Sequence, residues 1–231
     1  MSGFFITGTD TGVGKTLVTG ALIVALQQRG LTVAPMKPIA AGTVMANGMA
    51  VNEDVALLQE LSSHRFALPD VNPYCFAEPI APHIAAGRDG AHANLDVIRA
   101  AYARLAAQSD VVLVEGAGGF LVPMSRTASM AEIPVMLALP VILVVAMRLG
   151  CLNHALLTAE AIRARHLVLA GWVANTPGDQ MTAYEENLVT LERLLDAPRL
   201  GVINQLDAEN SVAAARLAAA LVDPGRLGLV A

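Results

Sequence analysis

The sequence predicts an α/β fold, in which helices cover both faces of a mostly parallel β-sheet. Short apolar runs alternate with longer amphipathic segments along the chain, as in repeated β-α-β units. The runs at 111–114 and 141–145 contain only apolar residues, which is typical of parallel strands buried on both faces. No internal repeat or linker-like segment divides the 231 residues, so we expect a single domain over 1–231.

The individual elements follow from the spacing of the apolar residues and from the residues that interrupt it. A buried strand is expected at 4–7, followed by a helix at 15–29 that Gly30 ends. The expected strands are 4–7, 31–36, 111–114, 141–145, 167–173 and 200–203, and the expected helices are 15–29, 52–61, 95–107, 153–165, 184–195 and 211–221. In such folds ligands bind beyond the carboxyl ends of the strands, here after residues 7, 36, 114, 145 and 173.

Composition excludes several classes of partner. The net charge is −5 without a basic stripe and aromatic residues make up 4%, which disfavours nucleic acid and anionic lipid. Mean hydropathy is +0.53, but the longest uncharged apolar stretch, 133–147, contains two prolines and is shorter than the roughly 20 residues of a spanning helix. We expect neither a membrane span nor a secretory signal. Cys75 and Cys151 form no disulfide or zinc pattern, so a cytoplasmic location is expected.

A glycine-rich loop, GTDTGVGKT at 8–16, joins the first expected strand to the first helix. Backbone N–H groups and the positive end of a helix dipole face phosphate oxygens in such loops. Lys15 is predicted to reach the β- and γ-phosphates, and the Thr16 hydroxyl to bind Mg²⁺. The strict motif has a glycine where this chain has Thr9. A turn that only caps a helix is the alternative, but the strand-loop-helix context favours a nucleotide site.

Two carboxylates are candidates for holding Mg²⁺. Glu115 follows the apolar run 111–114 and precedes Gly116-Ala117-Gly118-Gly119, which is the Walker B position. Asp54 lies in the first turn of an expected helix, where it could bind the metal or interact with the helix dipole.

Three other strand ends carry polar groups. Lys37 could contact a γ-phosphate or an anionic intermediate, or it could be a solvated lysine. Asn175 could recognise the edge of adenine or occupy a turn. The helix start at 149–154 could bind a carboxylate or phosphate, with Asn153 as a possible N-cap. We expect His83 and His154 to be structural, and no spacing suggests zinc.

Together these motifs resemble those of the dethiobiotin synthetases, the ATP-dependent enzymes of biotin synthesis. The resemblance extends to about residue 201. Its motifs are GTDTGVGKT at 8–16, KPIAAG at 37–42, VNPYCFAEPIAPH at 71–83, VLVEGAGGF at 112–120, LPVILVVAMRLGCLNHALLT at 139–158 and LAGWVAN at 169–175. The stretch 71–83 has no general nucleotide-binding meaning and is the family-specific part.

The resemblance implies a P-loop NTPase-like fold and a ligase that uses ATP and Mg²⁺. CO₂ would add to one amine of 7,8-diaminononanoate, ATP would phosphorylate the resulting carbamate, and the second amine would close the ureido ring. The products would be dethiobiotin, ADP and phosphate. Cationic groups suit this chemistry, because the carbamate and the triphosphate are both anionic and must be brought together.

The resemblance also implies a role for individual residues. The catalytic residues would be Lys37, Lys15 and Thr11, and the metal ligands Thr16, Asp54 and Glu115. The nucleotide site would comprise Gly12, Val13, Gly14, Lys15, Thr16, Leu17, Asp54, Glu115, Gly116, Ala117, Gly118, Asn175 and Asn204. The substrate site would comprise Thr11, Lys37, Ala41, Pro79, Gly150, Cys151 and Asn153. The family forms homodimers, and residues 150–153 would bind the substrate carboxylate from the neighbouring subunit.

Three positions depart from the family pattern. Ala41 replaces a common serine near the carbamate. Asn187 stands where a tyrosine would help to close the carboxylate pocket, and Tyr184, one turn earlier, is a candidate substitute. Asn204 lies where an Ile-Pro pair is expected, so the affinities for diamine and nucleotide could differ from family norms.

Two other classes share this fold, and loss of activity is a third alternative. Amide synthases of the cobyrinic acid type also carry a glutaminase domain, for which 231 residues leave no room. Partition-type switch ATPases place a second lysine where this chain has Asp10. They often end in a basic helix, whereas 211–231 contains only Arg216 and Arg226. Because Ala41 and Asn187 depart from the family pattern, the chain could also be a member of the family that has lost its activity.

Overall fold

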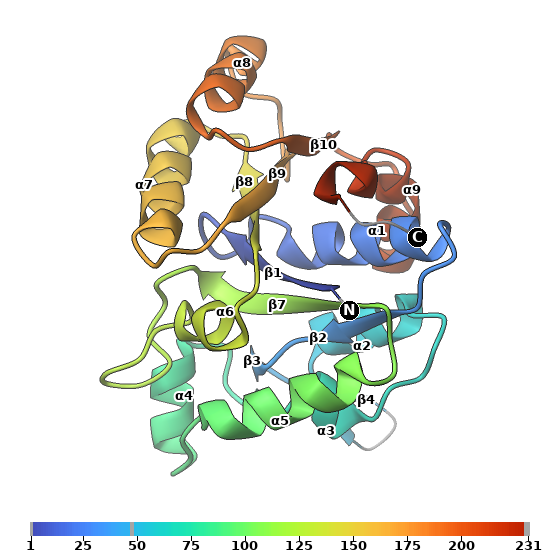
Figure 1. The fold of residues 1–231 in the computed structure, drawn as a ribbon, viewed down its shortest axis with the longest axis vertical. Helices are drawn as coiled ribbons and strands as arrows, with labels where there is room; N and C mark the ends of the chain where they lie inside the picture. Colours follow the sequence, from blue (N-terminus) through green and yellow to red (C-terminus); the bar gives the residue numbers. More distant parts are fainter. Residues whose placement is uncertain (1, 47–48, 229–231) are drawn as a thin grey trace.

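The computed structural model describes residues 2–46 and 49–228. Its framework is a six-stranded sheet in the order β10-β9-β8-β1-β7-β2, and each of its strand pairings is parallel (Figure 1). The strands are β1 (Ser2–Gly8), β2 (Val33–Met36), β7 (Val111–Gly119), β8 (Val141–Ala146), β9 (Leu169–Asn175) and β10 (Arg199–Ile203). The predicted α/β class is therefore confirmed.

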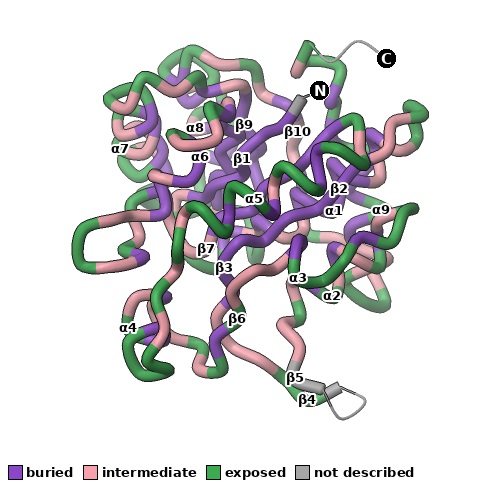
Figure 2. The backbone as a smooth tube through the Cα atoms, turned by 60° about the horizontal axis from the view of Figure 1, so that its bottom comes forward, coloured by how far each residue is buried: buried purple, intermediate pink, exposed green. Residues whose placement is uncertain are grey.

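Helices cover both faces of this sheet (Figure 1). One face packs against α1 (Lys15–Gln27), α2 (Glu53–Leu61) and α9 (Ser211–Ala219). The other packs against α5 (Leu95–Ala106), α6 (Glu132–Leu137), α7 (Cys151–Arg163) and α8 (Tyr184–Leu194). Buried residues run along the strands and the inner faces of these helices (Figure 2). No helix in the described part of the chain has the length and apolar character needed to cross a membrane.

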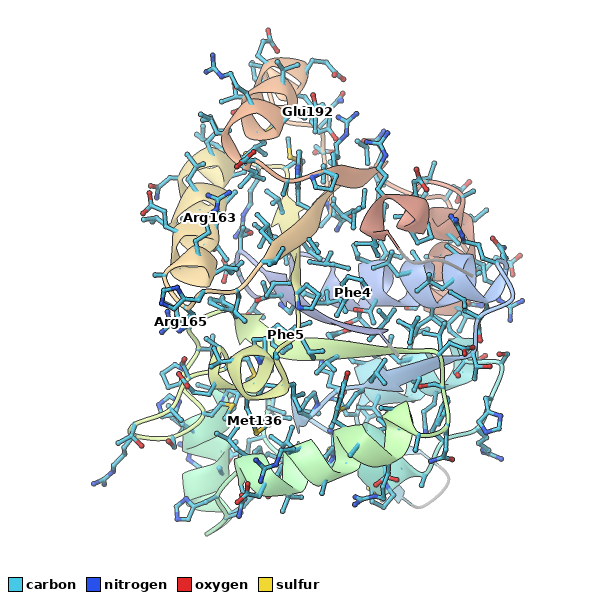
Figure 3. All side chains as sticks on the ribbon, viewed as in Figure 1. Phe4, Phe5, Met136, Arg163, Arg165 and Glu192 are labelled. Atoms are coloured by element: carbon cyan, nitrogen blue, oxygen red, sulfur yellow. The ribbon has the colours of Figure 1, made fainter. Side chains whose placement is uncertain are left out.

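The side chains of each central strand alternate between the two cores. Phe4 and Phe5 are neighbours on β1, yet Phe4 enters the core under α1 and Phe5 the core under α5 to α8 (Figure 3). Because both faces are covered, these strands are apolar at nearly every position, which is the pattern that predicted them.

Smaller elements were not predicted from the sequence. They are β3 (Ile39–Ala41), β4 (Val44–Ala46), β5 (Met49–Val51), α3 (Leu68–Val71), β6 (Tyr74–Phe76), α4 (Pro82–Arg88) and the 3₁₀ helix η1 (Pro224–Leu227), together with α6. Strands β3 and β6 pair in parallel, and β4 and β5 form an antiparallel hairpin. Each is too short to produce a periodic signal in the sequence.

Two predicted boundaries are wrong in ways that affect the site. Strand β7 continues to Gly119 rather than ending at 114, because its pairing with β1 includes Glu115 opposite Ile6. Glu115 therefore lies within the strand instead of directly after it. Helix α7 begins at Cys151, so Asn153 is not its N-cap; Gly150, with a left-handed φ of 94°, takes that place.

Candidate functional site

The loop at 8–16 connects β1 to α1 at the carboxyl edge of the sheet, as predicted. Gly12 and Gly14 adopt φ values of 72° and 92°, a left-handed conformation that favours glycine. The Asn175 amide donates a hydrogen bond to the Val13 carbonyl over 2.8 Å. A Cβ atom on Gly14 would lie only 2.1 Å from the Asn175 nitrogen. Asn175, the last residue of β9, therefore stabilises the conformation of the loop.

A cleft of about 630 Å³ opens above this loop. It joins segments far apart in sequence: the loop itself, the ends of β2 and β7, the start of α2, and the connection from β6 to α4. Twelve predicted site residues line it, namely Thr11, Gly12, Gly14, Lys15, Thr16, Lys37, Ala41, Asp54, Pro79, Glu115, Ala117 and Gly118. Nucleotide-sized ligands bind in concave sites of this size.

Lys37 lies between the two predicted carboxylates at the floor of the cleft. Its Nζ donates to Glu115 Oε1 over 2.6 Å and also contacts Asp54 Oδ2. The Thr16 hydroxyl donates to the same Glu115 oxygen over 3.0 Å. Lys37 is 5% exposed and Glu115 is fully buried. The tertiary structure thus assembles one charge cluster from four segments.

The surroundings shift the pKa values of three of these groups. Burial opposes the charged form of Lys37, but the charges of Glu115 and Asp54 outweigh it and raise the lysine pKa. Burial also acts against ionised Asp54, yet the neighbouring Lys37 lowers its pKa overall. Lys15 differs, because burial dominates and lowers its pKa from 10.5 to about 8. Its Nζ donates to the Asp10 carbonyl over 2.9 Å.

The donor set suits a hard divalent cation. Glu115 Oε2 is buried and has no hydrogen-bond partner among the described residues. Such an atom is costly to bury unless something else binds it. Two carboxylates and a hydroxyl are the oxygen ligands that Mg²⁺ prefers beside nucleotide phosphates and water. The residues present therefore fit the ion predicted from the sequence.

Other predicted residues lie outside the cleft. Val13 is buried beneath the loop, Leu17 packs against the core under α1, and Gly116 lies against the Phe5 ring. Those at the start of α7 are Gly150, Cys151 and Asn153, none of which lines the cleft.

Asn175 is the last residue of β9 and Asn204 directly follows β10, and neither residue lines the cleft. Asn175 is 2% exposed, and its amide nitrogen is already engaged with the loop backbone. The Tyr184 hydroxyl is 3.4 Å from Asn204 Oδ1 and 3.5 Å from Thr176 Oγ1. Tyr184 therefore lies beside Thr176 and Asn204 at the ends of β9 and β10.

Sequence reasoning missed part of the cleft wall. Asn52, Ile80, Ala81 and Val122 line it without having been singled out, and Pro82 had been noted only as part of the family-specific stretch. The segment 80–82 directly follows Pro79 in the family-specific stretch, so its position was a usable signal. Asn52 gave only the signal of a helix start. His83, expected to form structural hydrogen bonds, has a buried Nδ1 without a partner in the described residues.

Comparisons with known proteins agree with this geometry. A family model described as an AAA domain matches residues 2–212. A protein of Nitrosospira multiformis named ATP-dependent dethiobiotin synthetase BioD is 48% identical over 227 residues, which cover 98% of this chain and 97% of that protein. A protein of the same name from Aromatoleum aromaticum is 48% identical over 222 residues, covering 96% and 97%.

Solved structures share the fold at low sequence identity. The cell division ATPase MinD of Pyrococcus furiosus has a TM-score of 0.54 and 17% identity, with 94% of this chain and 97% of that chain covered. The septum site-determining protein MinD of Pyrococcus horikoshii, complexed with Mg-ADP, has a TM-score of 0.52 and 16% identity, with 94% of each chain covered. At such identities the likeness supports the fold alone.

Proposed function

The chain belongs to the family of ATP-dependent dethiobiotin synthetases, and from this premise we propose that it is a dethiobiotin synthase. It joins CO₂ to 7,8-diaminononanoate and closes the ureido ring at the expense of ATP. A carbamate forms on one amine, its oxygen takes the γ-phosphoryl group, and the second amine then attacks the carbonyl carbon and releases phosphate. The observation that carries this proposal is the identity of 48% over 98% of the chain, joined to a cleft that contains the predicted residues.

The chain's own cations bring the two anionic reactants together. Lys15 faces the phosphates from the loop, and Lys37 stabilises the charge of the carbamate and of the transferred phosphoryl group. Thr11 lies at the mouth of the cleft, where it orients the diamine. Thr16, Asp54 and Glu115 would hold Mg²⁺, which would supply charge neutralisation on the triphosphate when bound. The unpartnered Glu115 oxygen supports this assignment.

The nucleotide lies along the loop, with its base toward Asn175 and Asn204. This direction is supported by the position of Asn175 at the end of β9, where it contacts the loop at Val13, and of Asn204 directly after β10. Asn175 Oδ1 is the atom of that amide left to accept from the base, because its nitrogen donates to Val13. Gly12, Val13, Gly14 and Leu17 shape the loop and the helix start, and Gly116, Ala117 and Gly118 allow close approach from β7.

The diamine lies between Pro79 and Thr11 of the loop, and Ala41 lies beside the carbamate. Its carboxylate is bound by residues 150–153 of a second subunit in a homodimer. Two observations support this: the start of α7 lies outside the cleft of its own chain, and although the Cys151 N–H donates to the Arg148 carbonyl, the N–H groups of Leu152 and Asn153 have no partner within the helix. Apolar side chains are exposed nearby, with Leu149 at 93% and Leu157 at 56%.

The remaining expectations follow from the same family assignment. The single sheet with a core on each face supports one domain over 1–231. A cytoplasmic location is consistent with the requirement for ATP and with two cysteines that form no disulfide. The switch-ATPase alternative is less consistent with the site, because Asp10 occupies the position of the second lysine and pairs with Arg148 over 2.7 Å.

The test is phosphate release from Mg·ATP, measured with and without 7,8-diaminononanoate and bicarbonate, with product mass determined in parallel. We expect phosphate release that depends on the diamine, with one dethiobiotin formed per phosphate. Hydrolysis that is indifferent to the diamine would overturn the proposal and favour a switch ATPase.

A further inference from the structure

Asn52 uses both ends of its side-chain amide. It precedes α2 in an extended conformation, with φ −89° and ψ 131°. Its Oδ1 accepts a hydrogen bond from the Val55 N–H over 3.3 Å, as an N-cap does. Its Nδ2 donates to the Gly42 carbonyl over 2.8 Å. A cap needs only the acceptor, so the second hydrogen bond requires a separate explanation.

Gly42 is a fixed anchor for that bond. Its φ is 89°, its N–H donates to the Phe76 carbonyl over 3.0 Å, and a Cβ atom there would approach Pro79 to 3.0 Å. Gly42 also ends the short segment that starts at Lys37 and runs through β3. The carbonyl that accepts from Asn52 therefore belongs to the same segment of the chain as Lys37.

The hydrogen bond from Asn52 to Gly42 and the contact between Lys37 and Asp54 together close a loop of contacts. From Lys37 the chain runs to Gly42, the Asn52 amide crosses to the start of α2, and Asp54 returns to Lys37. Along the backbone, Gly42 and Asn52 are joined through strands β4 and β5, which pair as an antiparallel hairpin. That hairpin is a long path between two points that the amide joins directly.

The hydrogen bond from Asn52 to Gly42 helps to fix the position of Asp54. The Asp54 side chain is 43% exposed, whereas that of Lys37 is 6% exposed, so water competes for the carboxylate. We propose that Asn52 is a positioning residue: it holds the first turn of α2 against Gly42 and thereby places Asp54 in the cation site beside Lys37. This inference rests on the proposed function for its kinetic readout, but not for its binding readout.

Aspartate at position 52 separates the two roles of the amide. Asn52→Asp keeps the cap acceptor, loses the donor to Gly42, and sets a carboxylate oxygen against that carbonyl. Asparagine and aspartate are about equally good N-caps, so only the loss of the bond to Gly42 should lower stability, and we expect Tm to fall by no more than about 4 °C. We expect kcat to fall about tenfold, because small displacements of charged groups are costly in such sites. Mn²⁺ binding in the presence of ADP, measured by EPR, should weaken about fivefold.

Asn210 provides a matched control. It is also an N-cap, at the start of α9, where its side chain accepts from the Ala213 N–H over 2.9 Å. It does not line the cleft, so Asn210→Asp should change neither kcat nor Mn²⁺ binding.

The inference is overturned if Asn52→Asp keeps both kcat and Mn²⁺ affinity within twofold of the wild type. If that variant does not fold, Asn52→Ser, which also caps a helix without the amide, is held to the same criterion. A wild-type protein that makes no dethiobiotin would refute the proposed function instead, and Mn²⁺ binding would still decide the role of Asn52.

Discussion

Replacing Lys37 by methionine tests how the buried carboxylates are stabilised. The change removes the charge but keeps the length and the apolar stem. Glu115 is fully buried and would lose a charged partner at 2.6 Å. Breaking a buried ion pair from one side costs about 3–5 kcal/mol, and the exposure of Asp54 places this case near the lower end. A loss of about 3 kcal/mol lowers Tm by about 6–12 °C in a chain of this size.

A companion change isolates the electrostatic part of that loss. The double variant Lys37→Met/Glu115→Gln also neutralises the buried carboxylate that Lys37→Met leaves without its cation, so at least half of the lost unfolding free energy should return. Activity should not return, because losing the cation that stabilises the phosphoryl group costs about 10²-fold or more. Thermal unfolding and the rate of dethiobiotin formation measure the two effects. A wild-type Tm for Lys37→Met, or strictly additive losses in the double variant, would refute the reasoning.

Three further outcomes are expected. Gly14→Ala should abolish nucleotide binding in calorimetry, because its Cβ would meet Asn175 at 2.1 Å, whereas Gly12→Ala, with open space around it, should cost only about 1 kcal/mol of backbone strain; equal effects would contradict the clash. Lys15, with a pKa of about 8, is about three-quarters neutral at pH 8.5 and about one-tenth neutral at pH 7. Since phosphates restore its charge, Mg·ADP binding should take up correspondingly more protons at pH 8.5, measured by calorimetry in buffers of different ionisation enthalpy; equal uptake at both pH values would count against this. Mixed dimers of a Lys15→Met subunit and a subunit altered at 150–153 should regain activity, and an inactive mixture would argue against a shared site.

The sequence predicted the sheet and its main helices well, because strands buried on both faces leave uninterrupted apolar runs. It also placed the loop at 8–16 and the residues after the strands at one edge, because parallel strands end together. It did not reveal the extension of β7 through Glu115. Pairing with β1 there depends on a neighbouring strand, while the glycines that follow Glu115 resemble a loop.

The charge cluster was predicted only in part. Lys37, Asp54 and Glu115 were each singled out, but nothing local indicated that the lysine lies between the two carboxylates. The link from Asn52 to Gly42 was missed for a similar reason, because a helix cap and a tertiary tether look alike in sequence. Contacts of this kind depend on how distant segments pack, which single-residue patterns do not encode.

The central position of β1 has a consequence for synthesis of the chain. Its partners lie far downstream, since Ser2 pairs with Val111 and Phe5 with Val141. The hydrogen bond between Thr16 and Glu115 spans 99 positions. Because a ribosome adds about 5–20 residues per second, the first strand waits several seconds, apolar on both sides, before either neighbour emerges. We expect the nascent chain to depend on chaperones during that interval, and nucleotide to bind only after β9, whose Asn175 holds the loop, has left the ribosome.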